Sequence, residues 1–363
     1  MAKRAYIGVD GVARKVNRIY IGIDDIARKV KRVYIGIGGI ARPCWNVGLE
    51  YYGTITPLSR ARQSLAATTV GNYALFGGGY KDGYRLETVD AYDTLLTRST
   101  PTELSESRYG LAATTVGNYA LFGGGDSGGH TVGIVDAYDT SLTRSTPTPL
   151  RRARFYPAAT TVGNYALFCG STSDIIVDAY DTSLTHSTPA HLREGRNHLA
   201  ATTVGNYALF GGGYSGYLWD TVDAYDTSLT KSTPTGLSEA RCDLAATTVG
   251  NYALFGGGRV GGSRNTVDAY NTSLTRSTPT GLSEARYNLA ATTVGDYALF
   301  GGGYSGYLWD TVDAYDTSLT RSTPTGLSVA RESLAATTVG NCALFGGGYV
   351  DSPQDTVDVY IYN

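Results

Sequence analysis

Short hydrophobic runs recur along this chain, separated by glycine and polar turn residues. The phrase AATTVGNYALF occurs seven times with small changes, and its first glycine stands at residues 71, 117, 163, 205, 250, 295 and 340. Runs this short, rich in β-branched and aromatic residues, predict β-strands rather than helices. Self-similarity with a period of 42 to 46 residues indicates a repeat architecture.

One unit can be divided into four strands. In residues 199–241 we predict strands at 199–204, 207–210, 221–225 and 232–237, with a tight hairpin turn at Gly205-Asn206. Four antiparallel strands in a unit of this length are typical of a propeller blade. The first strand carries Ala-Ala, which suits the crowded axis. The fourth carries a proline in six copies, as expected at an exposed sheet edge.

The first and last parts of the repeat region complement each other. The seventh unit ends just after its third strand, whereas residues 53–62 (GTITPLSRAR) parallel residues 232–241 (STPTGLSEAR) of a complete unit. We therefore predict an all-β fold. Residues 47–363 form a seven-bladed β-propeller with four antiparallel strands per blade, and an N-terminal strand closes the last blade.

Residues 1–46 have a different composition and a different repeat. The whole chain has a net charge of −2, but residues 1–45 hold ten Lys or Arg against three Asp, which leaves about −9 for the rest. Three copies of a 14-residue unit, beginning RAYIGVDG, RIYIGIDD and RVYIGIGG, predict short strands and hairpins. Isolated hairpins are marginally stable, so we expect this basic module to need a partner chain, a second copy of itself, or the propeller.

Both regions resemble known families. The run Leu209–Gly212, the pair Tyr225-Asp226 and the pair Ala240-Arg241 make the 45-residue unit similar to a Kelch repeat, although serine stands where Kelch repeats usually carry a tryptophan. The YIGV…ARKV units resemble repeats at the start of predicted tail proteins of phages and prophages of gut Firmicutes. That resemblance implies attachment to a tail or baseplate protein through residues 1–46. A basic β-linker without a dedicated partner is the alternative.

The repeats differ mainly at one end of the predicted ring. The turn between strands one and two and the loop between strands three and four (near DTSLTRST) are almost constant. The residues after the recurrent arginine and the loops between strands two and three vary. We interpret the variable end as a recognition face, with drift of longer loops as the alternative. The candidate ligand-binding residues are Tyr80, Tyr84, Tyr109, Tyr156, His198, Tyr214, Tyr217, Trp219, Arg259, Arg264, Tyr287, Tyr304, Tyr307, Trp309 and Tyr349.

Aromatic residues of this kind suit sugar rings or protein epitopes, because they combine an apolar face with a polar tip. About half of them are expected to fill gaps between blades instead. The recurrent arginines at 62, 108, 154, 196, 241, 286 and 331 are expected to pair with recurrent aspartates such as Asp223 and Asp313 rather than to contact a ligand.

Signs of catalysis or metal binding are missing from the sequence. Its four histidines and four cysteines show no metal-ligand spacing, and no phosphate-binding loop occurs. We therefore expect no enzyme activity, no catalytic residues, no metal site and no cofactor. The acidic propeller argues against nucleic acid as a partner, and the absence of long apolar runs argues against membrane insertion.

The resulting hypothesis is a phage or prophage tail-associated receptor-binding propeller for a surface glycan or protein, able to form homo-oligomers. With no apparent signal peptide, we expect it in the virion, or in the bacterial cytoplasm before assembly. Two alternatives stay open. One is an intracellular bacterial Kelch scaffold for protein–protein interaction, and the other is a cryptic carbohydrate-active enzyme.

Overall fold

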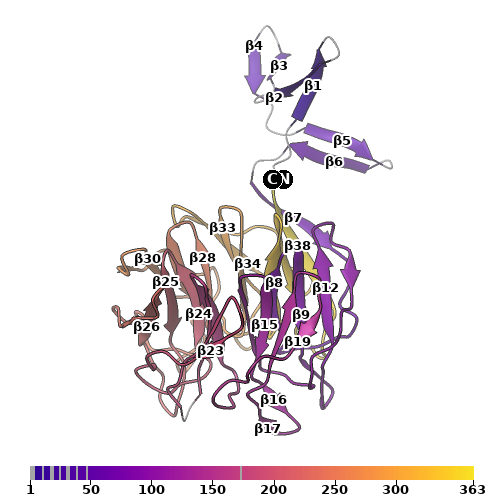
Figure 1. Ribbon diagram of the computed structural model, residues 1–363. Helices are drawn as coiled ribbons and strands as arrows, with labels where there is room; N and C mark the ends of the chain where they lie inside the picture. Colours follow the sequence, from indigo (N-terminus) through magenta and orange to yellow (C-terminus); the bar gives the residue numbers. More distant parts are fainter. Residues whose placement is uncertain are drawn as a thin grey trace.

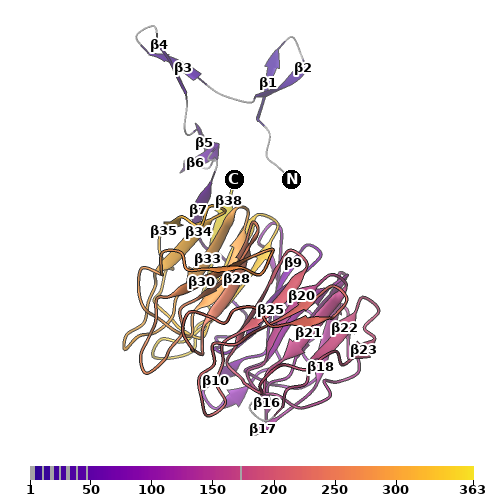
Figure 2. The same ribbon diagram turned by 90° about the vertical axis from the view of Figure 1, so that its left-hand side faces the viewer.

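The fold is known from a computed structural model that describes residues 48–171 and 174–363 and, for the backbone only, six strands before them. Seven four-stranded antiparallel sheets stand around a common axis (Figures 1 and 2). The predicted seven-bladed β-propeller is confirmed. None of the described residues forms a helix that could span a membrane.

The seven blades share one order of four antiparallel strands, and only in blade 7 does the fourth strand come from the other end of the propeller sequence. The strands are β8 (Ala66–Val70), β9 (Tyr73–Gly77), β12 (Val89–Asp93) and β13 (Arg98–Ser99) in blade 1; β14 (Ala112–Val116), β15 (Tyr119–Gly123), β18 (Val135–Asp139) and β19 (Arg144–Ser145) in blade 2; β20 (Ala158–Val162), β21 (Tyr165–Cys169), β22 (Asp178–Asp181) and β23 (His186–Ser187) in blade 3; β24 (Ala200–Val204), β25 (Tyr207–Gly211), β26 (Val222–Asp226) and β27 (Lys231–Ser232) in blade 4; β28 (Ala245–Val249), β29 (Tyr252–Gly256), β30 (Val267–Asn271) and β31 (Arg276–Ser277) in blade 5; β32 (Ala290–Val294), β33 (Tyr297–Gly301), β34 (Val312–Asp316) and β35 (Arg321–Ser322) in blade 6; and β36 (Ala335–Val339), β37 (Cys342–Gly346), β38 (Val357–Tyr362) and β7 (Leu49–Thr54) in blade 7.

The first strand of each blade lines the axis, as its small residues predict. The second threonine of each AATTV strand donates its hydroxyl to the backbone carbonyl of the matching threonine in the preceding blade. These bonds run around the whole ring through Thr69, Thr115, Thr161, Thr203, Thr248, Thr293 and Thr338. A threonine hydroxyl can donate only one proton, and here each of these threonines donates it to the preceding blade. The seven bonds together link every blade to both of its neighbours.

The core lies between blades. The phenylalanine of each second strand stacks edge-on against the tyrosine of its third strand, as Phe76 does with Tyr92 at 6.0 Å between ring centroids. A glycine in the preceding blade makes room for that ring: a Cβ at Gly77 would lie 2.7 Å from Phe122. In blade 3 the corresponding residue is Cys169, which is buried in the hydrophobic cluster that contains Phe210.

The predicted ring closure is confirmed, although the closing strand starts earlier than expected. Strand β7 covers Leu49–Thr54 rather than the range 53–62, and it pairs antiparallel with β38 from Leu49↔Tyr362 to Thr54↔Asp358. The Tyr51 hydroxyl donates a 2.7 Å hydrogen bond to Asp358, and its ring packs on Tyr360. Burial and the neighbouring Asp358 raise the pKa of Tyr51 to about 12.

The fourth strands are shorter than predicted. In blade 4 the strand covers only Lys231–Ser232, and Pro234 follows it instead of lying within it. A proline has no N–H to donate to the ladder, so its place just beyond the strand is consistent with ending the edge there.

Six strands precede the propeller in the chain and form three two-stranded antiparallel sheets. They are β1 (Ala5–Val9) with β2 (Val12–Val16), β3 (Tyr20–Ile23) with β4 (Ile26–Lys29), and β5 (Val33–Ile37) with β6 (Ile40–Trp45). Each 14-residue repeat thus contributes one strand pair. The expected turn residues 10–11, 24–25 and 38–39 lie outside the described residues.

Candidate functional site

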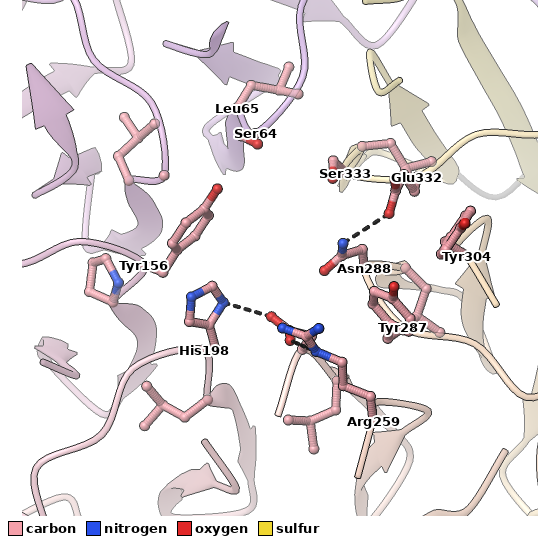
Figure 3. Close-up of a pocket in the computed structure, with 18 residues that line it drawn as sticks. Ser64, Leu65, Tyr156, His198, Arg259, Tyr287, Asn288, Tyr304, Glu332 and Ser333 are labelled. Atoms are coloured by element: carbon pink, nitrogen blue, oxygen red, sulfur yellow. Dashed lines mark hydrogen bonds and ion pairs between the residues drawn. The ribbon is translucent and has the colours of Figure 1, made fainter. Parts of the chain in front are cut away.

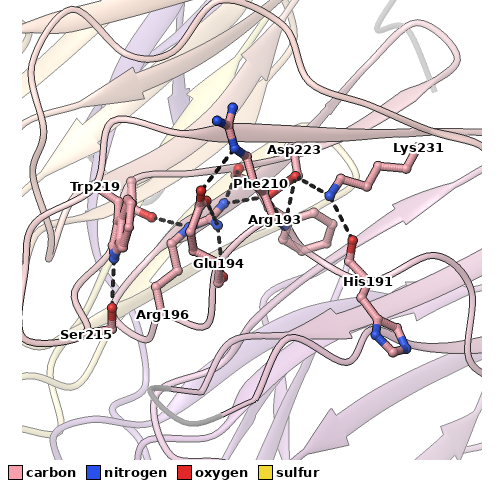
Figure 4. Close-up of polar contacts among 10 residues, drawn as sticks. His191, Arg193, Glu194, Arg196, Phe210, Ser215, Trp219, Asp223 and Lys231 are labelled. Carbon is pink, nitrogen blue, oxygen red and sulfur yellow. Dashed lines mark hydrogen bonds and ion pairs between the residues drawn. The ribbon is translucent and has the colours of Figure 1, made fainter.

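The recurrent arginines form buried ion pairs with recurrent aspartates, as predicted. Arg196 Nη2 lies 2.9 Å from Asp223 Oδ2, and both side chains are fully buried (Figure 4). The same pairing holds in the other six blades: Arg62–Asp90, Arg108–Asp136, Arg154–Asp178, Arg241–Asp268, Arg286–Asp313 and Arg331–Asp358. These arginines anchor the loops that connect strand four of one blade to strand one of the next. Because their side chains are buried, they are not available to a ligand.

The two kinds of variable loop meet at one end of the ring. In six blades the residue after the arginine forms a β-bridge with the start of the strand 2–3 loop of the same blade, as Asn197 does with Tyr214 and Tyr287 with Tyr304. Strands β16 (Asp126–Ser127) and β17 (His130–Thr131) form a small ribbon in one such loop. Figure 1 shows this ribbon at the end of the ring opposite the start of β7. A similar ribbon, β10 (Tyr80–Lys81) with β11 (Tyr84–Arg85), extends the loop of blade 1.

The opposite face is constant for packing reasons. In blade 4 the Asp226 carboxylate accepts hydrogen bonds from the backbone N–H groups of Ser228 and Thr230, and Leu229 adopts a φ of 61°. Thr227 of the same loop lies against the Gly163 turn of the preceding blade. A changed residue here would disturb both the turn and the contact between blades. The constancy of this face therefore follows from structure, and the recognition hypothesis depends on the variable face alone.

The variable face is built on a closed ring of backbone hydrogen bonds. The second residue after each arginine has a positive φ between 50° and 61°. Its N–H donates to the carbonyl of the matching residue in the preceding blade, at 2.9 to 3.3 Å. The seven residues are Ser64, Gly110, Tyr156, His198, Asp243, Asn288 and Ser333. A symmetric backbone ring thus carries seven positions whose side chains break the symmetry.

These side chains surround an axial funnel of about 460 Å³ (Figure 3). Its base is a collar of buried apolar residues: Leu65, Leu111, Pro157, Leu199, Leu244, Leu289 and Leu334. Its rim includes Tyr156, His198, Arg259, Tyr287, Tyr304 and Glu332. Its volume falls within the range of small-molecule sites, and polar groups contribute much of its exposed lining.

One wall of the funnel is a charged cluster. His198 Nδ1 and Arg259 Nε each lie 2.6 Å from a different oxygen of Asp243. Burial opposes ionisation of Asp243, but the hydrogen bond and charge of His198, together with Arg259, outweigh it and lower the pKa of this carboxyl. Arg259 also stands over the Tyr287 ring, 5.1 Å from its centroid. The cluster therefore holds an imidazole, a guanidinium and an aromatic ring in fixed positions.

A second cluster lies on the other side of the funnel. The Asn288 amide donates a 2.9 Å hydrogen bond to Glu332. Figure 3 shows this pair across the opening from Tyr156. The Tyr156 ring packs at a tilt against the His198 ring, with 4.4 Å between ring centroids, and against the Phe155 ring, with 4.2 Å between centroids. Polar and aromatic groups thus face one shared space from several blades.

The structure places the predicted site residues in different surroundings. Five line the funnel: Tyr156, His198, Arg259, Tyr287 and Tyr304. Tyr80 and Tyr109 pack on each other at 5.1 Å, and Tyr109 continues onto Phe155. Tyr84, Tyr217 and Tyr307 are exposed, with 74%, 76% and 63% of their surface accessible. Arg264 forms an ion pair with Glu239, and Tyr349 bridges Glu332 and Pro353 through its backbone.

The two tryptophans brace their own loops. Trp219 Nε1 donates a 2.8 Å hydrogen bond to Ser215 (Figure 4), and Trp309 does the same to Ser305. Both are partly buried and line neither the funnel nor the groove described below. Their first role is therefore to hold loop shape.

Sequence reasoning missed five polar funnel residues: Ser64, Asp243, Asn288, Glu332 and Ser333. A usable signal existed, because all five belong to the two-residue positions that vary after the recurrent arginine. The candidate list favoured aromatic residues and left out these shorter polar ones.

Cys169, Cys242 and Cys342 are buried thiols. The Cys242 thiol lies 3.1 Å from Asp243, and burial together with that carboxylate raises its pKa to about 12. Among the described residues no cluster of His, Cys, Asp and Glu is arranged to hold a metal ion.

Comparison with known proteins concerns the fold. No protein-family model and no curated protein matches the sequence. A solved structure described as "Structure of YjhT" superposes with a TM-score of 0.58 at 13% sequence identity, over 75% of this chain and 99% of that chain. At this identity the similarity shows a shared fold alone. The seven-bladed ring of four-stranded sheets is consistent with a Kelch-type propeller.

Proposed function

We propose that this protein is a non-enzymatic binding propeller that recognises a surface glycan through its axial funnel. The proposal rests on the contrast between the regular backbone ring and the variable side chains that line the funnel. The seven-membered backbone ring is nearly symmetric, but its side chains differ from blade to blade and place His198, Asp243, Asn288 and Glu332 around one cavity. Fixed hydrogen-bonding groups beside aromatic rings suit a ligand rich in hydroxyl groups.

The path of the chain supports an adhesive arrangement. Gly48 exchanges backbone hydrogen bonds with Asn363, and Tyr362 bonds to Asn341 in a strand 1–2 turn. The chain therefore enters the propeller at the constant face, opposite the funnel (Figure 1). A module at residues 1–46 that binds a tail or baseplate protein would be joined to the ring at the end away from the ligand. On this basis we propose a phage or prophage tail-associated receptor-binding protein.

A glycan array together with pulldown on bacterial cells tests the proposal. Wild-type protein is expected to bind array glycans, and Asn288→Ala and Tyr287→Ala are expected to weaken that binding. Tyr217→Ala is the matched control, because this exposed tyrosine lies on the variable face but does not line the funnel. Equal loss in the control and the funnel variants, or binding to protein receptors only, would contradict the glycan assignment.

The His198–Asp243 pair gives a second candidate function specific support. An imidazole oriented by a carboxylate can act as a general base, and Glu332 lines the same funnel. A carbohydrate-active enzyme would use these groups. Incubating array-positive glycans with the protein, and following products by mass spectrometry with His198→Ala as control, distinguishes turnover from binding.

A further inference from the structure

A second cavity continues from the funnel across blade 5. This groove of about 890 Å³ is lined by Tyr214 and Leu218 of blade 4, by Gly261, Gly262 and Ser263 of blade 5, and by Ser305 and Gly306 of blade 6. His198, Arg259 and Tyr287 line both the groove and the funnel. The two cavities therefore adjoin each other along these three side chains.

The groove lies over blade 5, whose strand 2–3 loop carries smaller side chains than the loops of blades 4 and 6. Blades 4 and 6 carry the same sequence, YSGYLWD, in their strand 2–3 loops. At the positions of Tyr217, Leu218 and Trp219, blade 5 has Gly262, Ser263 and Arg264. Two identical loops, each braced by its tryptophan, thus flank the position where blade 5 carries the smaller residues Gly262 and Ser263.

The lining of the groove indicates the chemistry of its occupant. Small residues and backbone groups dominate, Leu218 is the one aliphatic side chain among the residues that line it, and the Tyr214 ring is 44% exposed. Apolar surface and polar groups therefore lie side by side in this lining. A sugar chain can stack on tyrosine rings and exchange hydrogen bonds with glycine backbone, serine hydroxyls and Arg259.

We propose, building on the proposed glycan-binding function, that the protein recognises the end of an oligosaccharide chain. The terminal sugar occupies the axial funnel, and the following sugars leave through the groove over blade 5. Residues from all seven blades line the funnel above its collar of buried apolar residues, so the end of a chain is the occupant that we expect there. The Arg259–Asp243–His198 cluster stands where the terminal unit joins the next one.

Fragment length provides the test. Array-positive glycans are hydrolysed and separated into single sugars, disaccharides and longer oligomers, and the affinity of each is measured by calorimetry. Longer oligomers are expected to bind wild-type protein at least about tenfold more tightly than the terminal single sugar, a gain of about 1.4 kcal/mol.

Two groove variants separate the cavities. Ser263→Trp fills part of the groove and Tyr214→Ala removes a ring that lines only the groove. Both variants are expected to bind longer oligomers no more tightly than the single sugar, with the affinity for the single sugar unchanged. Asn288→Ala should weaken every length. Ser352→Trp in the corresponding loop of blade 7 and Tyr217→Ala in the blade 4 loop are the matched controls.

The outcomes separate this inference from the function on which it rests. Equal affinity at all lengths would overturn the chain-end assignment, as would equal loss for single sugars and oligomers in the groove variants. If wild-type protein bound no glycan on the array, the proposed function itself would fail. Internal fragments that bind as tightly as fragments with a natural chain end would also overturn the inference.

Discussion

The buried ion pair beneath the funnel allows a quantitative prediction. Arg241→Met keeps a long side chain but removes the guanidinium whose Nη2 lies 2.8 Å from Asp268, where neither side chain is exposed. It also removes the hydrogen bond that Arg241 donates to the Phe255 carbonyl. A buried charge that loses its partner typically costs 3–5 kcal/mol. Two remaining contacts reduce that cost: Ser238 still donates from its N–H and its hydroxyl to Asp268, and Arg276 Nε lies 3.8 Å from the same carboxylate. We therefore expect a loss of about 3 kcal/mol, at the lower end of that range.

Urea unfolding followed by tryptophan fluorescence measures this loss. A protein of this size can unfold in more than one step, so the first transition is compared between variants. Arg264→Met is the control, because its ion pair with Glu239 is partly exposed and should be worth at most about 1 kcal/mol. The double variant Arg241→Met/Asp268→Asn should recover at least about 1 kcal/mol relative to the sum of the single variants. An Arg241→Met protein as stable as the Arg264→Met control would refute the reasoning.

Three further predictions follow from the closing strand and the funnel. Removing residues 1–46 should leave the thermal unfolding midpoint of the propeller nearly unchanged. Removing residues 1–54 should lower that midpoint clearly, because this truncation deletes β7. Equal midpoints of the two truncated proteins would contradict closure by this strand. Because the folded-state pKa of Asp243 is lowered, its ionised form stabilises the fold above its ordinary pKa, and this stabilisation is lost as pH falls through the lowered value. The difference in midpoint between wild type and Asp243→Asn should therefore persist at neutral pH and shrink only below about pH 4. Cys242, whose pKa burial and Asp243 raise to about 12, should resist iodoacetamide at pH 8 in the native state, as mapped by mass spectrometry, and Asp243→Asn should increase its labelling.

The sequence alone determined the architecture, because the signals that define a blade are local. A glycine at each first turn, short runs of β-branched and aromatic residues and a period of 42 to 46 residues were enough to count seven blades and to find the strand that the seventh lacks. The pairing of Arg196 with Asp223 was also predictable, since a residue kept in every blade suits a contact repeated in every blade. The ends of the short outer strands were not, because a two-residue edge leaves little pattern.

The tertiary structure decided which variable residues share a cavity. Asp243, Asn288 and Glu332 each stand in a different blade, so no local pattern joins them, and they meet only because the closed ring brings seven equivalent positions to one axis. The structure also shows that the blade 5 loop with Gly262 borders one groove together with the loops of blades 4 and 6, and that Trp219 bonds to Ser215 of its own loop instead of lining the funnel. Repetition along the chain fixes the frame, whereas the binding surface arises from differences between repeats that become neighbours only in the folded ring.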